Sequence, residues 1–437
     1  MSIKLNKNLI LIILIFSAFL PYLSTLPIRI EQLIIYFFGF MFLFNIFVSF
    51  KIPKNGIYIS SILLILVFFS LIPIIFIDDV NLQMLNSRSL LYIISDIERL
   101  IRVIFIILIV TISLKSTKAE EFYKIKNACI NTFLFLLIIN TSLILFIFIS
   151  DILPTYLLEN YWNTDKDNLT DTVAGRSYLN GRFTGIFTQP MESGFTYGLG
   201  VLLLLYKNKF KFLFNFRDFI ILIFLMIGGI LSISKIFFLG IFFIIILIVF
   251  LNFKNTFLNL ISLLFLITVA FIIFNLVSVF EWAGMKSYSI IFSMFSSFEP
   301  AQIIDALSAG RFSNPESPIT LMINQVSEYS PFFGFGAGSF AANEVPVDSG
   351  YMLFYYQAGM IGFLIFFTTI LIMVVLQSLK IINSPGDDNL FLYLLLIYIL
   401  GTSIGSPVLF LNRSGTILWV FVILFLIHED KKIKITQ

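Results

Sequence analysis

The chain has 437 residues, of which 59% are hydrophobic and only 12% are charged, and its mean hydropathy is +1.00. A soluble domain has about a quarter of its residues charged, so this composition excludes a soluble protein and predicts an integral membrane protein. The single cysteine, Cys129, excludes an internal disulfide and a cysteine metal site. The single histidine, His428, leaves little support for zinc, haem or Ser-His-Asp catalysis.

Twelve apolar runs are candidates for membrane-spanning helices, because crossing a hydrocarbon core of roughly 30 Å takes about 20 residues. In chain order they are 9–26, 32–50, 57–77, 89–114, 128–150, 193–206, 219–234, 236–252, 256–279, 350–379, 389–406 and 414–428. The first run lacks a small-x-small cleavage site and many spans follow it, so we interpret it as an uncleaved helix. The predicted fold class is all-α: a polytopic membrane protein of about twelve transmembrane helices, forming one integral membrane domain over 1–437.

The basic residues predict the orientation, because Lys and Arg gather in cytoplasmic loops. With the N-terminus inside, 16 of the 19 lysines and Arg217 are cytoplasmic, which is 17 of the 28 basic residues. Both termini are therefore predicted to be cytoplasmic. Two large extracytoplasmic loops follow, at 151–192 and 280–349, and loops of that length are more often functional than passive.

The arginines are distributed differently from the lysines, since Arg217 alone of nine is predicted inside. Arginine kept in a lysine-rich chain suggests sites that need a planar, bidentate donor, such as phosphate sites. The alternative is that these are surface arginines without a function. Six are predicted outside, namely Arg29, Arg88, Arg176, Arg182, Arg311 and Arg413, and Arg99 and Arg102 lie within the fourth span.

The fourth span holds four charges near its outer end. Asp96 and Arg99 are spaced i,i+3, and Glu98 and Arg102 are spaced i,i+4, so both pairs can form on one helix. Charges at membrane depth are costly and normally face a bundle interior or a wet cavity. The two interpretations are mutually neutralising ion pairs and a polar wall of a substrate cavity.

The first large loop ends in AGRSYLNGRFTGIFTQPMESG, directly before the sixth span. Arg176 and Arg182, followed by a Gly/Pro-rich turn into a helix, place guanidinium groups and free N–H groups where anions bind. Glu192 is a candidate catalytic carboxylate or a first-turn acid that complements the helix dipole. Lys235, in SISK between two short spans, is either a buried polar contact or a snorkelling lysine.

The second large loop ends in a polar stretch at 311–362 that begins with Arg311. Ser317-Pro318 is a typical helix start, and the apolar residues after it follow helical spacing, which predicts a short amphipathic surface helix. The sequence GFGAGSF at 334–340 predicts either an anion-binding nest or a plain surface turn. Glu344 and Asp348 follow, and Asp348 enters the tenth span, where a partly desolvated carboxylate can act as a base.

Three segments together resemble the bacterial O-antigen polymerase (Wzy) family: GRFTGIFTQPMESG, SISK, and SAGRF…PFFGFGAGSF…VDSGYMLFYYQAGMIGFL. They are also similar to the related O-antigen ligases, which share the plan of many helices with large periplasmic loops. The similarity of topology covers most of the chain. Similarity of motifs covers about 176–200, 230–240 and 308–363.

The resemblance implies that Arg182 and Arg311 hold lipid diphosphates, and that Lys235 stands where the family usually has an arginine. Ligases carry a histidine just before the last long-loop helix. This chain has Asp348 in that neighbourhood and no extracytoplasmic histidine, which favours a polymerase. The full set of candidates is Arg182, Arg311, Arg176, Lys235, Arg99 and Arg102 for diphosphate binding, and Asp348, Glu344 and Glu192 for catalysis.

The implied reaction is a metal-independent glycosyl transfer on the outer face of a bacterial cytoplasmic membrane. A glycan linked to undecaprenyl diphosphate is the donor, and a hydroxyl of a lipid-linked repeat unit is the acceptor; the product is O-antigen or a related surface polysaccharide. A chain-length regulator is a further expected partner, and no cofactor or nucleic acid is expected. The alternatives are a ligase-like transferase and a non-enzymatic flippase, although long polar outer loops fit an enzyme better.

Overall fold

The computed structural model describes residues 7–23, 28–49, 54–76, 90–114, 117–211, 214–251, 318–338, 349–383, 386–403 and 406–436. These residues are all-α: they form helices, and their one β feature is an isolated bridge between Tyr22 and Arg29. Two compact units are assembled from alternating segments of the chain. The first unit contains Met1–Ile34, Lys118–Ser296 and Asn383–Tyr398, and the second contains Ile35–Thr117, Ser297–Ile382 and Ile399–Gln437.

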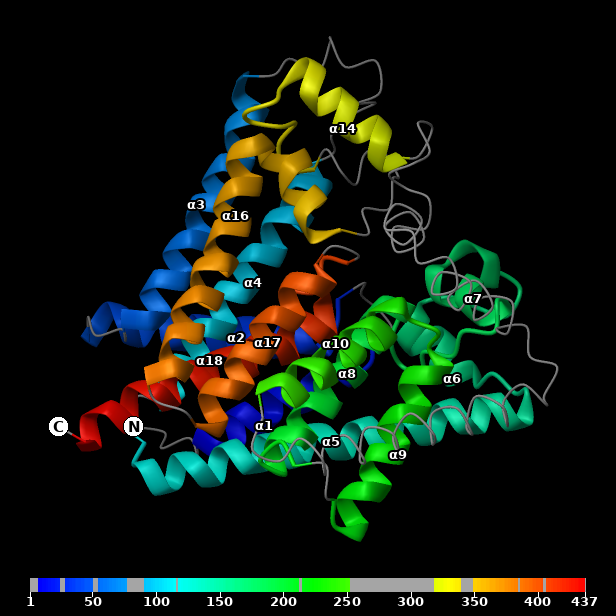
Figure 1. Ribbon diagram of the computed structural model, residues 1–437. Helices are drawn as coiled ribbons and strands as arrows, with labels where there is room; N and C mark the ends of the chain where they lie inside the picture. The colour runs from blue at the N-terminus through cyan, green and yellow to red at the C-terminus, as the bar shows by residue number, and fades with distance from the viewer. Residues whose placement is uncertain are drawn as a thin grey trace. The chain divides into compact units, whose positions relative to one another are not determined.

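The first unit is built around α8, which packs against α5, α9 and α10, while α1 packs against α5 (Figure 1). Its main helices are α1 (Lys7–Ser17), α5 (Ala119–Ser150), α8 (Pro190–Lys207), α9 (Phe216–Leu231), α10 (Lys235–Leu251) and most of α17 (Asp387–Thr402). Glycines let α8 approach its neighbours closely: a Cβ on Gly198 would clash with Tyr398, and one on Gly200 would lie 2.6 Å from Leu137. Nearly every side chain of α8 is therefore buried.

The first large loop of the sequence is itself helical. Its elements are α6 (Thr155–Leu157), the short π-helix η2 (Leu158–Trp162), the 3-10 helix η3 (Leu169–Asp171) and α7 (Val173–Leu179). Thr172 caps α7 by accepting a hydrogen bond from the Gly175 N–H at 3.1 Å. Short polar helices of this kind carry no long apolar period, so the sequence did not indicate them.

The second unit is built around α4, which packs against α3 and α18. Its elements are α2 (Ile30–Ser49, begun in the first unit), α3 (Lys54–Phe76), α4 (Leu90–Leu114), α14 (Pro318–Tyr329), α16 (Gly350–Asn383) and α18 (Asn412–Thr436). Helix α14 begins at the predicted Pro318, which confirms the short amphipathic helix in the second loop. Helix α16 is broken at Ala358 and Gly359, where Gly359 has φ +61°.

Ten of the twelve predicted spans coincide with helices, and 256–279 lies outside the described residues. The first predicted span, 9–26, is helical only as far as Ser17, where α1 ends, and a turn and the bridge at Tyr22 follow. Helix α5 begins at Ala119 rather than 128, because its charged first turns are amphipathic and continue the helix. Among the described residues, α5 and α16 are long and apolar enough to cross a membrane. Shorter apolar stretches are Ile30–Phe44, Tyr58–Ile74 and Asn412–Ile427.

Candidate functional site

Two segments that sequence analysis singled out separately meet at the N-terminus of α8 in the first unit. Gly194 lies so close to the turn between α9 and α10 that a Cβ there would clash with Ser234. Just before α8, the Phe183 N–H donates to the Leu231 carbonyl at 2.9 Å. The GRFTGIFTQPMESG segment is thus held along the SISK turn, and glycine at 194 is what permits the approach.

Hydrogen bonds with the side chain of Asn140 in α5 hold the loop that leads into α8. The amide Oδ1 of Asn140 accepts from the Ile186 N–H at 2.9 Å, and its Nδ2 donates to Tyr197 Oη at 2.9 Å. The Trp162 Nε1–H donates to the Gly185 carbonyl at 3.0 Å. Gly185 has φ +62°, and a Cβ there would clash with Asn140, so this position requires glycine.

Arg182 and Arg176, the two arginines of this loop, have different surroundings. Arg176 is exposed on α7 and its Nε donates to the Thr172 carbonyl at 3.4 Å. Arg182 is half-buried after α7, its N–H donates to the Ser177 carbonyl at 2.9 Å, and its buried Nε has no acceptor among the described residues. Burial lowers the pKa of Arg182, and its Nε–H, unpaired among those residues, is a donor from which an anion can accept.

Glu192 lies in the first turn of α8 and is only 2% exposed. Its Oε2 accepts from Thr188 Oγ1 at 3.4 Å. The hydroxyls of Ser193 and Ser234 are buried and, in the described part of the chain, have no hydrogen-bond partner. A carboxylate and two unsatisfied hydroxyls at one helix start are unusual in a buried place, because such groups are normally paired.

Lys235 is the first residue of α10 and is half-buried. A cation at a helix N-terminus opposes the helix dipole, which costs about 0.3–1 kcal/mol at an exposed position. Its place beside the turn of α9 and α10 is as predicted. Its role at the site stays a prediction.

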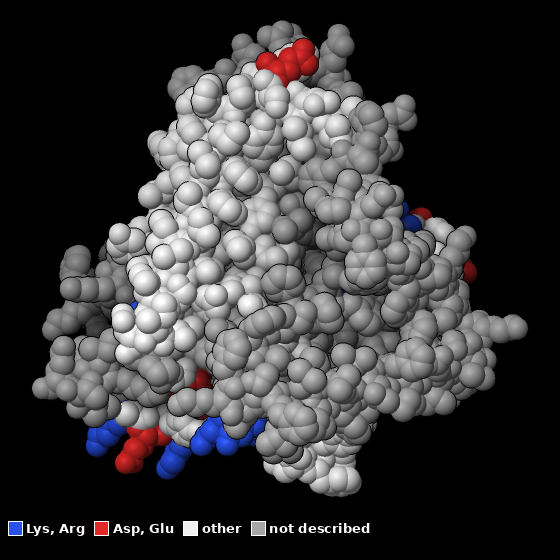
Figure 2. Space-filling view, in the orientation of Figure 1, with Lys and Arg blue, Asp and Glu red and all other residues white. Residues whose placement is uncertain are grey.

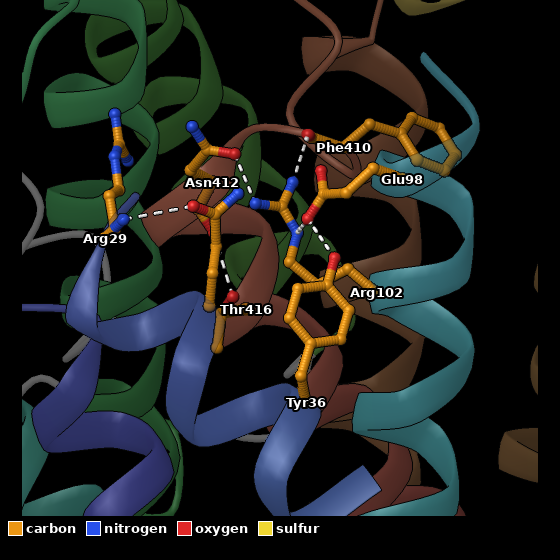
Figure 3. A network of polar contacts seen from close by, with 8 residues as sticks. Arg29, Tyr36, Glu98, Arg102, Phe410, Asn412 and Thr416 are labelled. Carbon is orange, nitrogen blue, oxygen red and sulfur yellow. Dashed lines mark hydrogen bonds and ion pairs between the residues drawn. The ribbon is translucent and has the colours of Figure 1, made fainter. Parts of the chain in front are cut away.

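Arg29 is a site residue that sequence analysis counted among the outer arginines but did not assign. It directly precedes α2, is 4% exposed, and its Nη2 donates to Tyr22 Oη at 2.7 Å. Its backbone N–H donates to Gln32 Oε1 at 3.1 Å, which is the contact drawn to Arg29 in Figure 3. Burial alone would lower the pKa of Arg29, but the charges of Tyr22, Glu192 and Glu31 outweigh it and raise that pKa. Phe19, shortly before the Tyr22–Arg29 bridge, packs edge-on against Phe187 of the loop that leads into α8, with ring centroids 5.9 Å apart, so this connection lies against the segment that leads to Glu192.

The second unit holds the charges of the fourth span, and both predicted pairs are confirmed. Arg99 Nη1 lies 3.7 Å from Asp96 Oδ1, and Arg102 Nε lies 3.9 Å from Glu98 Oε1. The side chain of Arg99 is one-third exposed, whereas that of Arg102 is buried. Diphosphate binding by either arginine stays a prediction.

The contacts of Arg102 favour the structural alternative for that residue. Its Nη2 donates to the Phe410 carbonyl at 3.3 Å and its Nη1 to Asn412 Oδ1, so each guanidinium nitrogen has a partner (Figure 3). Tyr36 Oη donates to Glu98 in the same network. A buried guanidinium that already contacts protein oxygens through all three nitrogens has little capacity left for a phosphate.

The glycine-rich turn at 334–338 is neither an open nest nor a plain surface turn. Its residues are buried, and each of its five N–H groups donates to a protein oxygen. The acceptors, in order, are the carbonyls of Ser330, Tyr356, Gln357 and Ser70 and the carboxylate Oδ2 of Asp96. Because a nest needs free N–H groups, this turn cannot hold an anion as it stands. Its hydrogen bonds instead connect α3, α4 and the first part of α16, before the break in that helix.

Three predicted residues, Arg311, Glu344 and Asp348, lie outside the described residues, and their roles stay predictions. No protein-family model, no curated protein and no solved structure matches the chain.

Proposed function

We propose that this chain is a membrane-embedded glycosyltransferase that joins undecaprenyl-diphosphate-linked repeat units into O-antigen or a related surface polysaccharide. The observation that carries the proposal is the meeting of two of the three polymerase-like segments at the start of α8. There a half-buried arginine whose Nε is unpaired among the described residues (Arg182), a buried carboxylate (Glu192) and a half-buried lysine (Lys235) come from neighbouring elements. Glycosyl transfer from a diphosphate needs this combination of cations and a base.

A membrane setting is supported by large apolar side chains that stay exposed, and the apolar runs of the sequence are the basis for about twelve spans. Phe37, Phe40 and Phe44 of α2 are 67%, 64% and 73% exposed. Many apolar residues along α16 are 39–76% exposed, and Figure 2 shows an uncharged surface along most of that helix. Apolar faces of this size are rare in water, and lipid would cover them. The orientation that places basic loops inside puts the start of α8 on the outer face, toward the periplasm or cell exterior.

The proposed reaction exchanges one bond for another. The anomeric carbon of the donor glycan loses its bond to the diphosphate oxygen and forms a bond to the acceptor hydroxyl oxygen. A carboxylate takes the hydroxyl proton, and undecaprenyl diphosphate leaves with the electron pair of the broken bond. Arg182 and Arg311 would stabilise the charge on that leaving group. Glu192, Glu344 and Asp348 are the candidates for the base.

The test is reconstitution of the purified protein in lipid nanodiscs with lipid-linked repeat units isolated from cells that lack this gene. A ladder of longer lipid-linked glycans is the expected product. Transfer only to a different final acceptor would favour a ligase, and transbilayer movement without any new bond would favour a flippase. Either outcome would overturn the proposal.

A further inference from the structure

Arg29 is held rigidly, yet part of its guanidinium has no protein partner. Tyr22 and Arg29 form a β-bridge, and the Tyr22 N–H donates to the Asn160 carbonyl at 2.7 Å, which ties this connection to the first large loop. Tyr22 Oη accepts from Nη2, and the guanidinium carbon lies 4.7 Å from the centre of the Tyr22 ring. Its Nε and Nη1 are buried and have no acceptor in the described part of the chain. A buried donor left without an acceptor is costly, so these two nitrogens are placed to receive a ligand.

The charges around Arg29 indicate which kind of ligand fits. Glu31 lies two residues after Arg29, and Phe19, before the bridge, packs edge-on against Phe187 of the loop that leads to Glu192, with ring centroids 5.9 Å apart. Both carboxylates are buried, and both raise the pKa of Arg29. Two carboxylates against one cation would repel a further anion, so a phosphate or carboxylate is a poor occupant. A neutral hydroxyl can accept from the Arg29 N–H groups and donate to a carboxylate oxygen at the same time. Adjacent hydroxyls of this kind are what a sugar ring presents.

We propose that Arg29, together with Glu192, forms the subsite for a hydroxyl-bearing sugar ring of the acceptor repeat unit. The inference rests on the proposed function and deepens it, because it separates the sugar-binding arginine from Arg182, the diphosphate-binding one. Arg29 is a positioning residue: it accepts no proton, but it holds the sugar so that its hydroxyl faces the buried carboxylate. The sugar hydroxyl is thereby held beside Glu192, the base candidate in the first turn of α8.

The test uses two soluble probes that separate sugar from diphosphate. One is the repeat-unit oligosaccharide released from its lipid and diphosphate, and the other is inorganic pyrophosphate. Each is titrated calorimetrically against the whole protein in nanodiscs, as wild type and as Arg29→Lys, Glu192→Gln and the control Arg217→Lys. Arg29→Lys removes the Nε and Nη1 donors. The fold is expected to survive because the lysine keeps a cation beside the two carboxylates. Arg217 is exposed on α9 and serves as the matched control.

Arg29→Lys and Glu192→Gln are each expected to weaken oligosaccharide binding at least 10-fold and to leave pyrophosphate binding unchanged, while Arg217→Lys changes neither. Oligosaccharide binding that is absent in wild type or unchanged in both variants overturns the inference. Loss of pyrophosphate binding in Arg29→Lys also overturns it and makes Arg29 an anion ligand. Polymer formation by the wild type is scored separately, so a polymerase that fails only the oligosaccharide test rejects this subsite and leaves the proposed function standing.

Discussion

Lys126 Nζ lies 2.6 Å from Asp388 Oδ1 inside the first unit, and the lysine side chain is fully buried. Tyr206 Oη donates to the same oxygen at 2.7 Å, so α5, α8 and α17 share one polar cluster. The ammonium also lies 5.3 Å from the ring centre of Tyr123 and 5.1 Å from that of Tyr206. A buried charge with this many partners is a cross-link between helices rather than a topology marker.

Breaking this pair is expected to destabilise the protein strongly. Lys126→Met leaves the Asp388 carboxylate buried without its counter-charge, which should cost about 3–5 kcal/mol of unfolding free energy. The double variant Lys126→Met/Asp388→Asn removes both charges and should recover more than half of that loss. Equilibrium unfolding in mixed micelles measures both values.

The matched comparison is Lys207→Met, which breaks the more exposed pair with Asp218, where Lys207 Nζ lies 3.1 Å from Oδ1. That change should cost roughly 1 kcal/mol, because Lys207 is already partly hydrated and the Asp218 carboxylate keeps hydrogen bonds from Asn208 Nδ2 and Asn215 Nδ2, each at 3.2 Å. Equal losses for Lys126→Met and Lys207→Met would show that burial does not set the strength of the first pair.

The break in α16 makes a second prediction about stability. Gly359 has φ +61°, and a Cβ there would clash with the Phe332 backbone, because the Met360 N–H donates to the Pro331 carbonyl at 2.9 Å. Gly359→Ala should therefore cost at least about 2 kcal/mol from the left-handed backbone and the clash. Gly401→Ala, in α17 with nothing within 4 Å of its Cβ, should gain up to about 1 kcal/mol from helix propensity. Thermal unfolding of the two variants in the same detergent tests the contrast, and a neutral Gly359→Ala would contradict it.

Local patterns in the sequence predicted local structure well. The start of α14 at Pro318 and the ion pairs of α4 follow from residues within four positions of one another. The partners of Asn140 and Lys126, and all but one partner of the glycine-rich turn, could not be predicted, because they lie tens to hundreds of residues away. Asp96 has one contact of each kind. Its pairing with Arg99 is local and was expected, whereas its hydrogen bond from the Gly338 N–H at 2.8 Å depends on the fold.

For the candidate site, the sequence indicated which types of residue take part better than it indicated which of them lie together in space. Arginine against a lysine-rich background was a signal that included Arg29, but nothing local connected this residue to Glu192. That connection depends on the fold, in which the Tyr22–Arg29 bridge follows Phe19 and Phe19 packs against Phe187 of the loop that leads into α8. The same signal also included Arg102, whose guanidinium contacts Glu98, Phe410 and Asn412 instead.

The diphosphate role of the loop arginines makes a third prediction. Arg182→Ala and Arg311→Ala should each abolish long chains while the protein still inserts, with a fall in rate on the order of 100-fold for loss of one charge-stabilising donor. Arg311→Lys should rescue only in part, because lysine cannot make the bidentate contact. Glycan length on gels and membrane levels of the protein are the two measurements. Long chains persisting in both alanine variants would rule out the diphosphate clamp.

The base is tested by exchanging each candidate carboxylate for its amide. A general base contributes about 100- to 10,000-fold, so the variant that removes it should lower kcat by at least about 100-fold while KM changes little. Asp348→Asn and Glu192→Gln are compared directly, with Glu344→Gln beside them. The buried position of Glu192 at the start of α8 predicts that Glu192→Gln affects both kcat and the binding of the acceptor sugar, whereas a base at Asp348 would affect kcat alone. Normal polymer from Asp348→Asn, together with a slow Glu192→Gln, would assign proton transfer to Glu192, and the reverse result would leave Glu192 as a positioning residue beside Arg29.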